Sequence, residues 1–292
     1  MFTGLYTALI TPFDKGQIDA EAFGRLIEFQ VASGVDGLVV CGTTGESAVM
    51  TDQEYERTVR FCVETVAGRI PVIVGTGGNN TRKVIANTQV AKAWGADAAL
   101  IVTPYYNKPT QEGLFEHYSA VHDATDLPVI LYNVPGRTGV CLSVETIARL
   151  SELPRIAGIK DAVPDIMRPL KIRAAVKKND FSVLSGEDAS IVAFLAHGGD
   201  GCVSVTANIA PALCVALIRA WRDKNWPEIE RLRDLMWPLH EVMFIETNPS
   251  PVKYAASLAG YGDGSVRLPL CEVSESSAGK IREVLRSVGI AG

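Results

Sequence analysis

The sequence predicts an α/β protein of the (β/α)8 barrel class, the TIM barrel, with a helical extension at its C-terminus. Eight short apolar segments rich in β-branched residues recur along the chain, and a helix-like segment follows each of them. Segments that are apolar on both faces are typical of parallel strands covered on both sides, and eight such strands close a barrel. The alternative is an open doubly wound sheet. That fold would carry a phosphate loop after its first strand, where Thr11-Pro12-Phe13-Asp14 stands instead.

The expected strands share this apolar character, and each ends at a polar residue or a glycine. They are Tyr6–Ile10, Gly37–Cys41, Val72–Gly75, Ala98–Val102, Val129–Tyr132, Ile156–Lys160, Phe181–Ser185 and Cys202–Val205. Amphipathic segments lie between them. Asp19 is the expected N-cap of a helix over residues 20–33, and Thr51-Asp52-Gln53-Glu54 reads as the capping box of a helix that extends to Ala67.

The strand pattern stops after Trp221, and the rest of the chain reads as helices. The first of these carries Pro238, which should kink it. Two more helices are expected over residues 251–259 and 274–288, on either side of the glycine-rich segment 260–264. We therefore predict a catalytic barrel domain over residues 1–224 and a helical domain over residues 225–292. Such an extension often covers a subunit contact, so we expect an oligomer.

The composition excludes several classes of function. With 47% hydrophobic and 21% charged residues and a net charge of −5, the chain is typical of a compact globular protein. It has no basic block, so neither nucleic acid nor an anionic membrane is an expected partner. It begins without a signal-peptide pattern, and no apolar run is long enough for a membrane span, which predicts a cytoplasmic protein. The six cysteines and four histidines are scattered, so no metal site is expected.

Lys160 is the residue around which a catalytic interpretation is built. The run Ile156-Ala157-Gly158-Ile159 ends abruptly in this primary amine, and the carboxylate of Asp161 follows. A lysine normally lies on a solvated face. If Lys160 closes a buried strand, burial favours its neutral form, which can attack a carbonyl group. The functional interpretation is a Schiff-base lysine, and the alternative is a surface lysine one step beyond the strand.

Other polar residues follow the expected strands, where the active sites of such barrels lie. Gly42-Thr43-Thr44-Gly45-Glu46 is a turn that suits a small carboxylate, or an ordinary structural turn. Tyr106 and Tyr132 are phenols that could relay protons or simply pack at the barrel mouth. Arg137 has the planar fork that binds a carboxylate, or it makes a surface ion pair. Gly186 and Val203 are expected to line the pocket through their backbones.

Together these segments resemble the class I aldolase-like enzymes of the dihydrodipicolinate synthase and N-acetylneuraminate lyase group. The resemblance covers essentially the whole chain, and five ordered motifs make chance agreement negligible. The arginine of Pro135-Gly136-Arg137-Thr138-Gly139 resembles the dihydrodipicolinate synthase branch, because sialic acid lyases generally lack it. The matching motifs are Gly42-Thr43-Thr44-Gly45-Glu46, Tyr105-Tyr106-Asn107-Lys108-Pro109, Tyr132-Asn133-Val134-Pro135-Gly136-Arg137-Thr138-Gly139, Gly158-Ile159-Lys160-Asp161 and Asn248-Pro249-Ser250-Pro251-Val252-Lys253.

The resemblance implies a role for each matching residue. Lys160 would form an imine with pyruvate, and the backbone N–H groups of Thr43 and Thr44 would hold the carboxylate of pyruvate. Tyr132 would be the principal proton donor and acceptor. The imine draws electrons from the methyl group of pyruvate, and the resulting enamine attacks an aldehyde. The resemblance implies no metal and no organic cofactor.

It also implies partners for this site. Thr44 would link Tyr132 to Tyr106, which in this family reaches across a dimer interface into the neighbouring subunit's site. Arg137 would bind the carboxylate of aspartate semialdehyde at the site entrance. A homotetramer built as a dimer of dimers is therefore expected. Two alternatives remain, namely another pyruvate-dependent lyase that acts on a sugar acid and a binding barrel without catalysis.

A lysine effector site is the last implication of the resemblance. Ser47, Ala48, Asn79 and Tyr105 match the cleft where members of the family bind lysine as a feedback inhibitor. In contrast, Asp52 and Tyr55 stand where sensitive bacterial enzymes often carry histidines, and Lys83 stands where they often carry glutamate. A cationic Lys83 conflicts with an incoming lysine, so the hypothesis is weak or absent inhibition by lysine.

Overall fold

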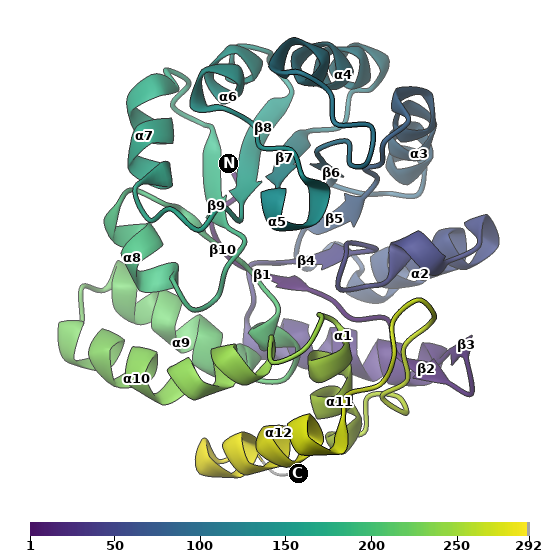
Figure 1. Ribbon diagram of the computed structural model, residues 1–292, viewed down its shortest axis with the longest axis vertical. Coiled ribbons are helices and arrows are strands. Elements are labelled where there is room, and N and C mark those ends of the chain that lie inside the picture. Colours follow the sequence, from purple (N-terminus) through teal and green to yellow (C-terminus); the bar gives the residue numbers. More distant parts are fainter. Residues whose placement is uncertain (291–292) are drawn as a thin grey trace. The chain divides into compact units, whose positions relative to one another are not determined.

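The computed structural model describes residues 1–290 and has the predicted barrel (Figure 1). Its strands are joined in the closed order β1-β10-β9-β8-β7-β6-β5-β4. The registers between β5 and β10 are those of parallel neighbours. The barrel strands are β1 (Gly4–Ala8), β4 (Gly37–Val40), β5 (Val72–Gly75), β6 (Ala98–Val102), β7 (Val129–Asn133), β8 (Ile156–Asp161), β9 (Ser182–Ser185) and β10 (Gly201–Ser204).

Helices follow the strands as the sequence predicts. In the barrel part they are α1 (Ala20–Ser33), α2 (Asp52–Val66), α3 (Thr81–Ala93), α4 (Gln111–Ala124), α5 (Pro135–Thr138), α6 (Val144–Ser151), α7 (Arg168–Ala175), α8 (Ile191–Ala196) and α9 (Pro211–Arg222). Short 3-10 turns η1 (Ser47–Val49) and η2 (Thr206–Asn208) follow β4 and β10. The C-terminal helices are α10 (Trp226–Val242), α11 (Ser250–Leu258) and α12 (Glu275–Ser287).

The predicted helix starts are confirmed in atomic detail. The Asp19 side chain accepts from the backbone N–H of Ala22 at 2.9 Å, which satisfies a donor that the helix cannot. The Thr51 and Glu54 side chains form the reciprocal capping box at the start of α2. Pro238 lies inside α10, which continues to Val242.

One small element was not predicted. Residues 13–18 form a hairpin of β2 (Phe13–Asp14) and β3 (Gln17–Ile18), which pair antiparallel. Both turn residues have positive φ, 49° at Lys15 and 77° at Gly16, as a two-residue hairpin turn of this hand requires. The sequence gives little warning because lysine, unlike glycine, rarely adopts that conformation.

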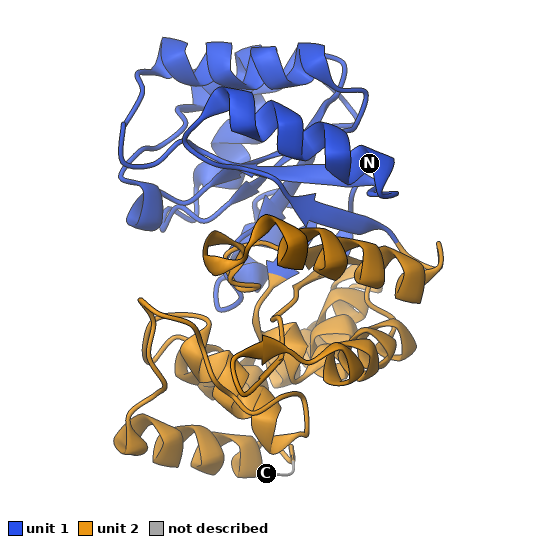
Figure 2. Ribbon diagram, turned by 90° about the vertical axis from the view of Figure 1, so that its right-hand side faces the viewer, with its two compact units in different colours: residues 1–4, 71–203 blue, residues 5–70, 204–292 orange. Residues whose placement is uncertain are grey.

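The chain forms two compact units (Figure 2). The first contains residues 1–4 and 71–203, and the second contains residues 5–70 and the chain from 204 onward. The C-terminal helices thus group with α1 and α2 in the second unit, where α11 packs on α12 and on η2. The predicted domain boundary at residue 224 stays a prediction. The two compact units divide the chain at other positions. No helix within residues 1–290 combines the length and the apolar character needed to cross a bilayer.

Candidate active site

Lys160 lies in a buried position near the end of β8, with 6% of its surface exposed. Its Cα is in register with that of Tyr132 on β7, and its Nζ atom lies 4.5 Å from the centre of the Tyr132 ring. Tyr132 is itself 8% exposed. The chain thus places a primary amine and a phenol side by side in a largely dry environment, and Lys160 is not a surface lysine.

Gly186 packs directly against this lysine. It follows β9, and its backbone N–H donates to the Asp161 carbonyl at 2.8 Å. A Cβ atom at Gly186 would lie 3.2 Å from Cε of Lys160 and 2.7 Å from Cβ of Ala162, which is too close for any side chain. That Gly186 and Val203 line a pocket through their backbones stays a prediction. Val203, on β10, is buried at 2% exposure.

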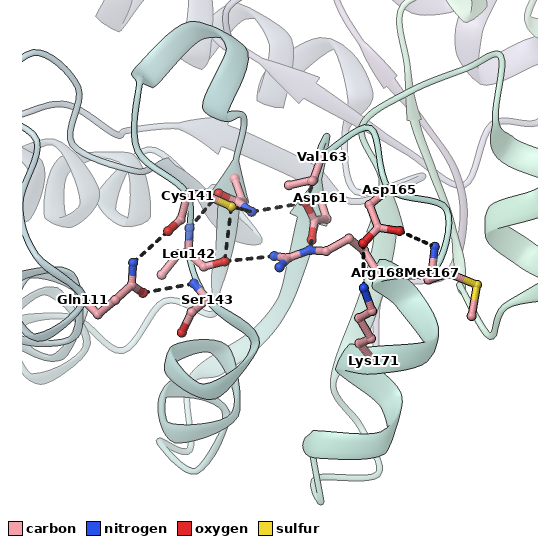
Figure 3. A network of polar contacts seen from close by, with 11 residues as sticks. Gln111, Cys141, Leu142, Ser143, Asp161, Val163, Asp165, Met167, Arg168 and Lys171 are labelled. Atoms are coloured by element: carbon pink, nitrogen blue, oxygen red, sulfur yellow. Dashed lines mark hydrogen bonds and ion pairs between the residues drawn. The ribbon is translucent and has the colours of Figure 1, made fainter.

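Asp161 does not serve Lys160, although it follows it in the sequence. Successive strand residues point to opposite faces, and the Asp161 carboxylate binds Arg168 instead. Arg168 Nε donates to it at 3.0 Å (Figure 3). Asn133 Nδ2 donates to it at 3.2 Å. Burial raises the pKa of Asp161, and the Arg168 guanidinium opposes that shift. Asn133 follows Tyr132 on β7, and Asp161 follows Lys160 on β8. The hydrogen bond between Asn133 and Asp161 therefore joins the two strands next to the candidate catalytic residues.

The same network holds the segment that leads from α5 to α6. Arg168 also donates to the Leu142 carbonyl at 2.9 Å. The Gln111 amide donates to the Cys141 carbonyl at 2.8 Å, while its oxygen accepts from the Ser143 N–H at 3.0 Å (Figure 3). The connection after α5 is therefore held by a buried contact from Arg168 and by two exposed contacts from Gln111.

Arg137 lies on α5, a single turn directly after β7. Pro135 begins this turn, and Gly139 ends it in the left-handed conformation with φ of 68°. The buried Thr138 hydroxyl donates within the turn, at 3.2 Å from the Val134 carbonyl and 2.9 Å from that of Val140. The turn is thus rigid, and it leaves the Arg137 side chain exposed just beyond the strand that carries Tyr132.

Tyr106 points away from the fold. Its side chain is 89% exposed, and its backbone has a positive φ of 69°. The neighbouring Tyr105 is 41% exposed. The isolated chain therefore presents the Tyr106 phenol outward, as a residue that acts in another subunit would be presented.

The turn of Thr43 and Thr44 follows β4 in the second compact unit. Its last two N–H groups are used internally, since Gly45 donates to the Gly42 carbonyl at 3.2 Å and Glu46 to that of Thr43 at 3.1 Å. Within residues 1–290 the N–H groups of Thr43 and Thr44 bond to no other group. The buried Thr44 hydroxyl accepts from Asn248 Nδ2 at 3.1 Å. Two adjacent N–H donors are thus available to a carboxylate.

These observations agree with the comparisons with known proteins. The sequence model of the dihydrodipicolinate synthetase family matches residues 1–288. The chain belongs to this family. Members of the dihydrodipicolinate synthetase family include a 4-hydroxy-tetrahydrodipicolinate synthase of Rhodospirillum centenum, which is 52% identical over 290 residues and covers 99% of both chains.

Solved structures of the family have nearly the same fold as this chain. The dihydrodipicolinate synthase of Aquifex aeolicus has a TM-score of 0.97 and 44% identity, covering 99% of each chain. A chloride-inhibited dihydrodipicolinate synthase of Acinetobacter baumannii, solved in complex with pyruvate, has a TM-score of 0.96 and 41% identity. That match covers 99% of this chain and 100% of the other.

Sequence reasoning gave no role to the residues that support the threonine turn. Glu46, at its end, forms a buried ion pair with Lys253 of α11, and Arg267 of the following loop donates its backbone N–H to the same carboxylate. Asn248 holds Thr44. Asn248 and Lys253 lie far from any expected strand end, so the strand pattern does not indicate them. The one signal for them in the sequence was the match of residues 248–253 to a motif of the family.

The residues of the expected effector cleft lie on turns and loops. The Ser47 hydroxyl is 3.4 Å from the Gly42 carbonyl, which accepts its hydrogen bond, and Ala48 is exposed. The Asn79 carbonyl accepts from Asn107 at 3.0 Å. Lys83 is exposed on α3. Binding of lysine by these residues stays a prediction.

Proposed function

We propose that this chain is a 4-hydroxy-tetrahydrodipicolinate synthase, a lyase of the class I aldolase type. It condenses pyruvate with L-aspartate-4-semialdehyde through a lysine Schiff base, a step of the diaminopimelate route to lysine. The observation that carries the proposal is the buried Lys160 amine, 4.5 Å from the Tyr132 ring, in a chain of the dihydrodipicolinate synthetase family. The curated relatives with this activity are 45–52% identical over nearly the full length.

The proposed chemistry follows from the types of side chain available. The neutral Lys160 amine attacks the ketone of pyruvate, and loss of water gives the imine. The Tyr132 phenol, beside that amine, passes protons during these steps and during the formation of the enamine. The N–H groups of Thr43 and Thr44 hold the carboxylate of pyruvate. This role is supported because the two groups have no other partner within residues 1–290.

Arg137 selects the second substrate in this proposal. The enamine attacks the aldehyde of aspartate semialdehyde, and the guanidinium binds the carboxylate of that molecule through two parallel hydrogen bonds. Its exposure on the rigid α5 turn, directly beyond the strand of Tyr132, supports this role. A sugar-acid lyase would need hydroxyl-binding groups at the same place.

We further propose a cytoplasmic homotetramer built as a dimer of dimers. The Tyr106 side chain, 89% exposed, is the residue offered to a second subunit. A separate exposed apolar group, Ile166, Met167 and Leu170 at the start of α7, is 54%, 39% and 47% exposed. Large apolar side chains grouped in this way are typical of a subunit contact.

Intact mass tests the proposal most directly. The protein is treated with pyruvate and borohydride, as wild type and as Lys160→Ala, and the condensation with aspartate semialdehyde is then assayed. We expect a pyruvyl adduct that is absent from Lys160→Ala, together with turnover of the semialdehyde. An adduct without turnover would indicate another pyruvate-dependent lyase, which a panel of aldehydes would identify. The absence of any adduct would leave a binding barrel.

Weak or absent inhibition by lysine is the regulatory part of the proposal. A cationic side chain at position 83 repels the ammonium group of an effector lysine, and this repulsion is removed in Lys83→Glu. We expect the wild type to retain most of its activity in millimolar lysine and Lys83→Glu to be inhibited at lower concentrations. Half-inhibition of the wild type at submillimolar lysine would contradict the hypothesis.

A further inference from the structure

A buried ion pair lies directly behind the threonine turn. Lys253 Nζ is 2.6 Å from Glu46 Oε1, and each side chain is only 1% exposed. The other carboxylate oxygen, Oε2, accepts the backbone N–H of Arg267 at 2.9 Å. The Lys253 ammonium also lies 3.6 Å from the centre of the Phe13 ring. Both oxygens of Glu46 are therefore occupied, and these contacts hold its side chain in place.

This pair is not explained by stability alone. Removing two charges from water can cost more free energy than their attraction returns, and replacing a buried pair with well-packed apolar residues is often neutral or stabilising. Burial lowers the pKa of Lys253 to about 8, although the neighbouring Glu46 carboxylate raises it. A buried pair of this kind fixes one geometry, because each charge accepts few alternative positions.

The Glu46–Lys253 pair fixes the geometry of the turn over residues 42–46. Glu46 has a left-handed backbone with φ of 56°, which a glutamate does not adopt without support from its surroundings. Its N–H closes the turn on the Thr43 carbonyl. At the preceding position the Gly45 carbonyl accepts from the Thr11 hydroxyl at 2.8 Å, and a Cβ on Gly45 would lie 3.1 Å from the Leu9 carbonyl oxygen.

We propose that Lys253, acting through Glu46, is a positioning residue that aims the N–H groups of Thr43 and Thr44 and thereby sets the affinity for the carboxylate of the keto-acid substrate. The inference rests on the proposed function, in which those N–H groups bind pyruvate. It gives the C-terminal segment a part in binding the substrate, since α11 supplies Lys253 and the loop after it supplies Arg267.

The test is a double variant that removes both charges, Glu46→Gln/Lys253→Met. Lys253→Met alone would leave a carboxylate buried without its counter-charge and would risk unfolding the protein. The matched control is Glu28→Gln/Arg69→Met, which neutralises an exposed pair of the same compact unit, 2.6 Å apart and 53% and 41% exposed. If the double variant does not fold, Glu46→Gln alone replaces it, because the lysine can then shed its proton.

We expect the Michaelis constant for pyruvate to rise about ten- to a hundredfold in the double variant, as a displaced binding group predicts. The kcat value and the Michaelis constant for aspartate semialdehyde should stay within about threefold, because the reacting groups are unchanged. A role in stability alone would lower the melting temperature and leave the pyruvate constant unchanged. That result would overturn the inference.

Amide hydrogen exchange separates this inference from the proposed function. The N–H groups of Gly45 and Glu46, which are bonded within the turn, should exchange faster in the double variant and at the wild-type rate in the control. If the wild type formed no pyruvate adduct, the proposed function would fail while the exchange result still decided whether the ion pair orders the turn. Unchanged exchange would overturn the inference whatever the activity.

Discussion

Gly186 packs so closely against Lys160 that a larger residue at this position should disturb the lysine. A Cβ there would lie 2.7 Å from Cβ of Ala162 and 3.2 Å from Cε of Lys160. We expect Gly186→Ala to displace the lysine side chain and to slow pyruvate trapping by about ten- to a hundredfold. The rate of adduct formation by intact mass measures this effect.

The control for this substitution is Gly279→Ala in α12, where an added Cβ meets nothing within 4 Å. Alanine is the better helix former, so this variant should gain roughly 0.5–1 kcal/mol of stability and trap pyruvate at the wild-type rate. Equal trapping by Gly186→Ala and wild type would show that the lysine does not depend on the space at position 186.

Asp161 and Arg168 allow a second prediction at the scale of single residues. Arg168→Met leaves the Asp161 carboxylate, whose side chain is 1% exposed, without its counter-charge. We expect a loss of about 3–5 kcal/mol in the free energy of unfolding, measured with urea. The double variant Asp161→Asn/Arg168→Met should lose clearly less, because no charge is left buried. Equal losses in the two variants would mean that the pair is not coupled.

The sequence is informative about the candidate catalytic residues because each is a polar side chain at the end of an apolar strand. Lys160 and Tyr132 could be found in this way. Glu46 and Lys253 could not, because they are 207 positions apart and their pairing exists only in the folded chain. A lysine within a helix is ordinarily a solvated residue, and nothing local indicates that Lys253 is buried.

At the scale of elements, periodicity and capping were the reliable signals. The strand bounds agree with the prediction to within two residues, and α1 has the predicted bounds, because apolar runs and Asp19 are local signals. The β2–β3 hairpin was missed because a residue distant in the sequence holds it. Its residues are held from outside by Arg267, whose guanidinium donates to the Gly16 carbonyl and lies 4.6 Å from the centre of the Phe13 ring.

Arg267 also stabilises the start of α2, and this gives a pH prediction. Its guanidinium binds Glu54 and lowers the pKa of that carboxyl from 4.5 to about 2. A lowered carboxyl pKa contributes stability that is fully present above pH 4.5 and is lost as the pH falls toward 2. The contribution is about 3 kcal/mol at neutral pH. We expect Arg267→Met to lose most of it and to flatten the dependence of unfolding free energy on pH in that window.

The control is Arg60→Met, which removes an exposed pair with Glu56 on the same helix. Its effect on the free energy of unfolding should stay below about 0.5 kcal/mol. Urea unfolding at a series of pH values compares the three proteins. A pH profile of Arg267→Met that runs parallel to that of the wild type would show that Glu54 owes its low pKa to other groups.

At the scale of the whole molecule, the two compact units cut across the predicted domains. The sequence suggests a boundary where strands give way to helices, yet α11 and the residues on either side of it supply the contacts that hold the turn after β4. Those contacts join parts of the chain that are distant in sequence, and pattern reasoning along the chain does not detect them.

Tyr106 makes the assembly itself a prediction. A phenol that is 89% exposed packs little against its own subunit, and we expect it to complete the site of a partner. Tyr106→Phe and Lys160→Ala should each be nearly inactive as homo-oligomers. When they are mixed in equal amounts and allowed to exchange subunits, half of the dimers are hybrids, and each hybrid holds one site with both native residues. The mixture should therefore regain about a quarter of the wild-type activity in the condensation assay. If Tyr106 acted within its own subunit, no hybrid would contain an intact site, and the mixture would stay as inactive as its two components.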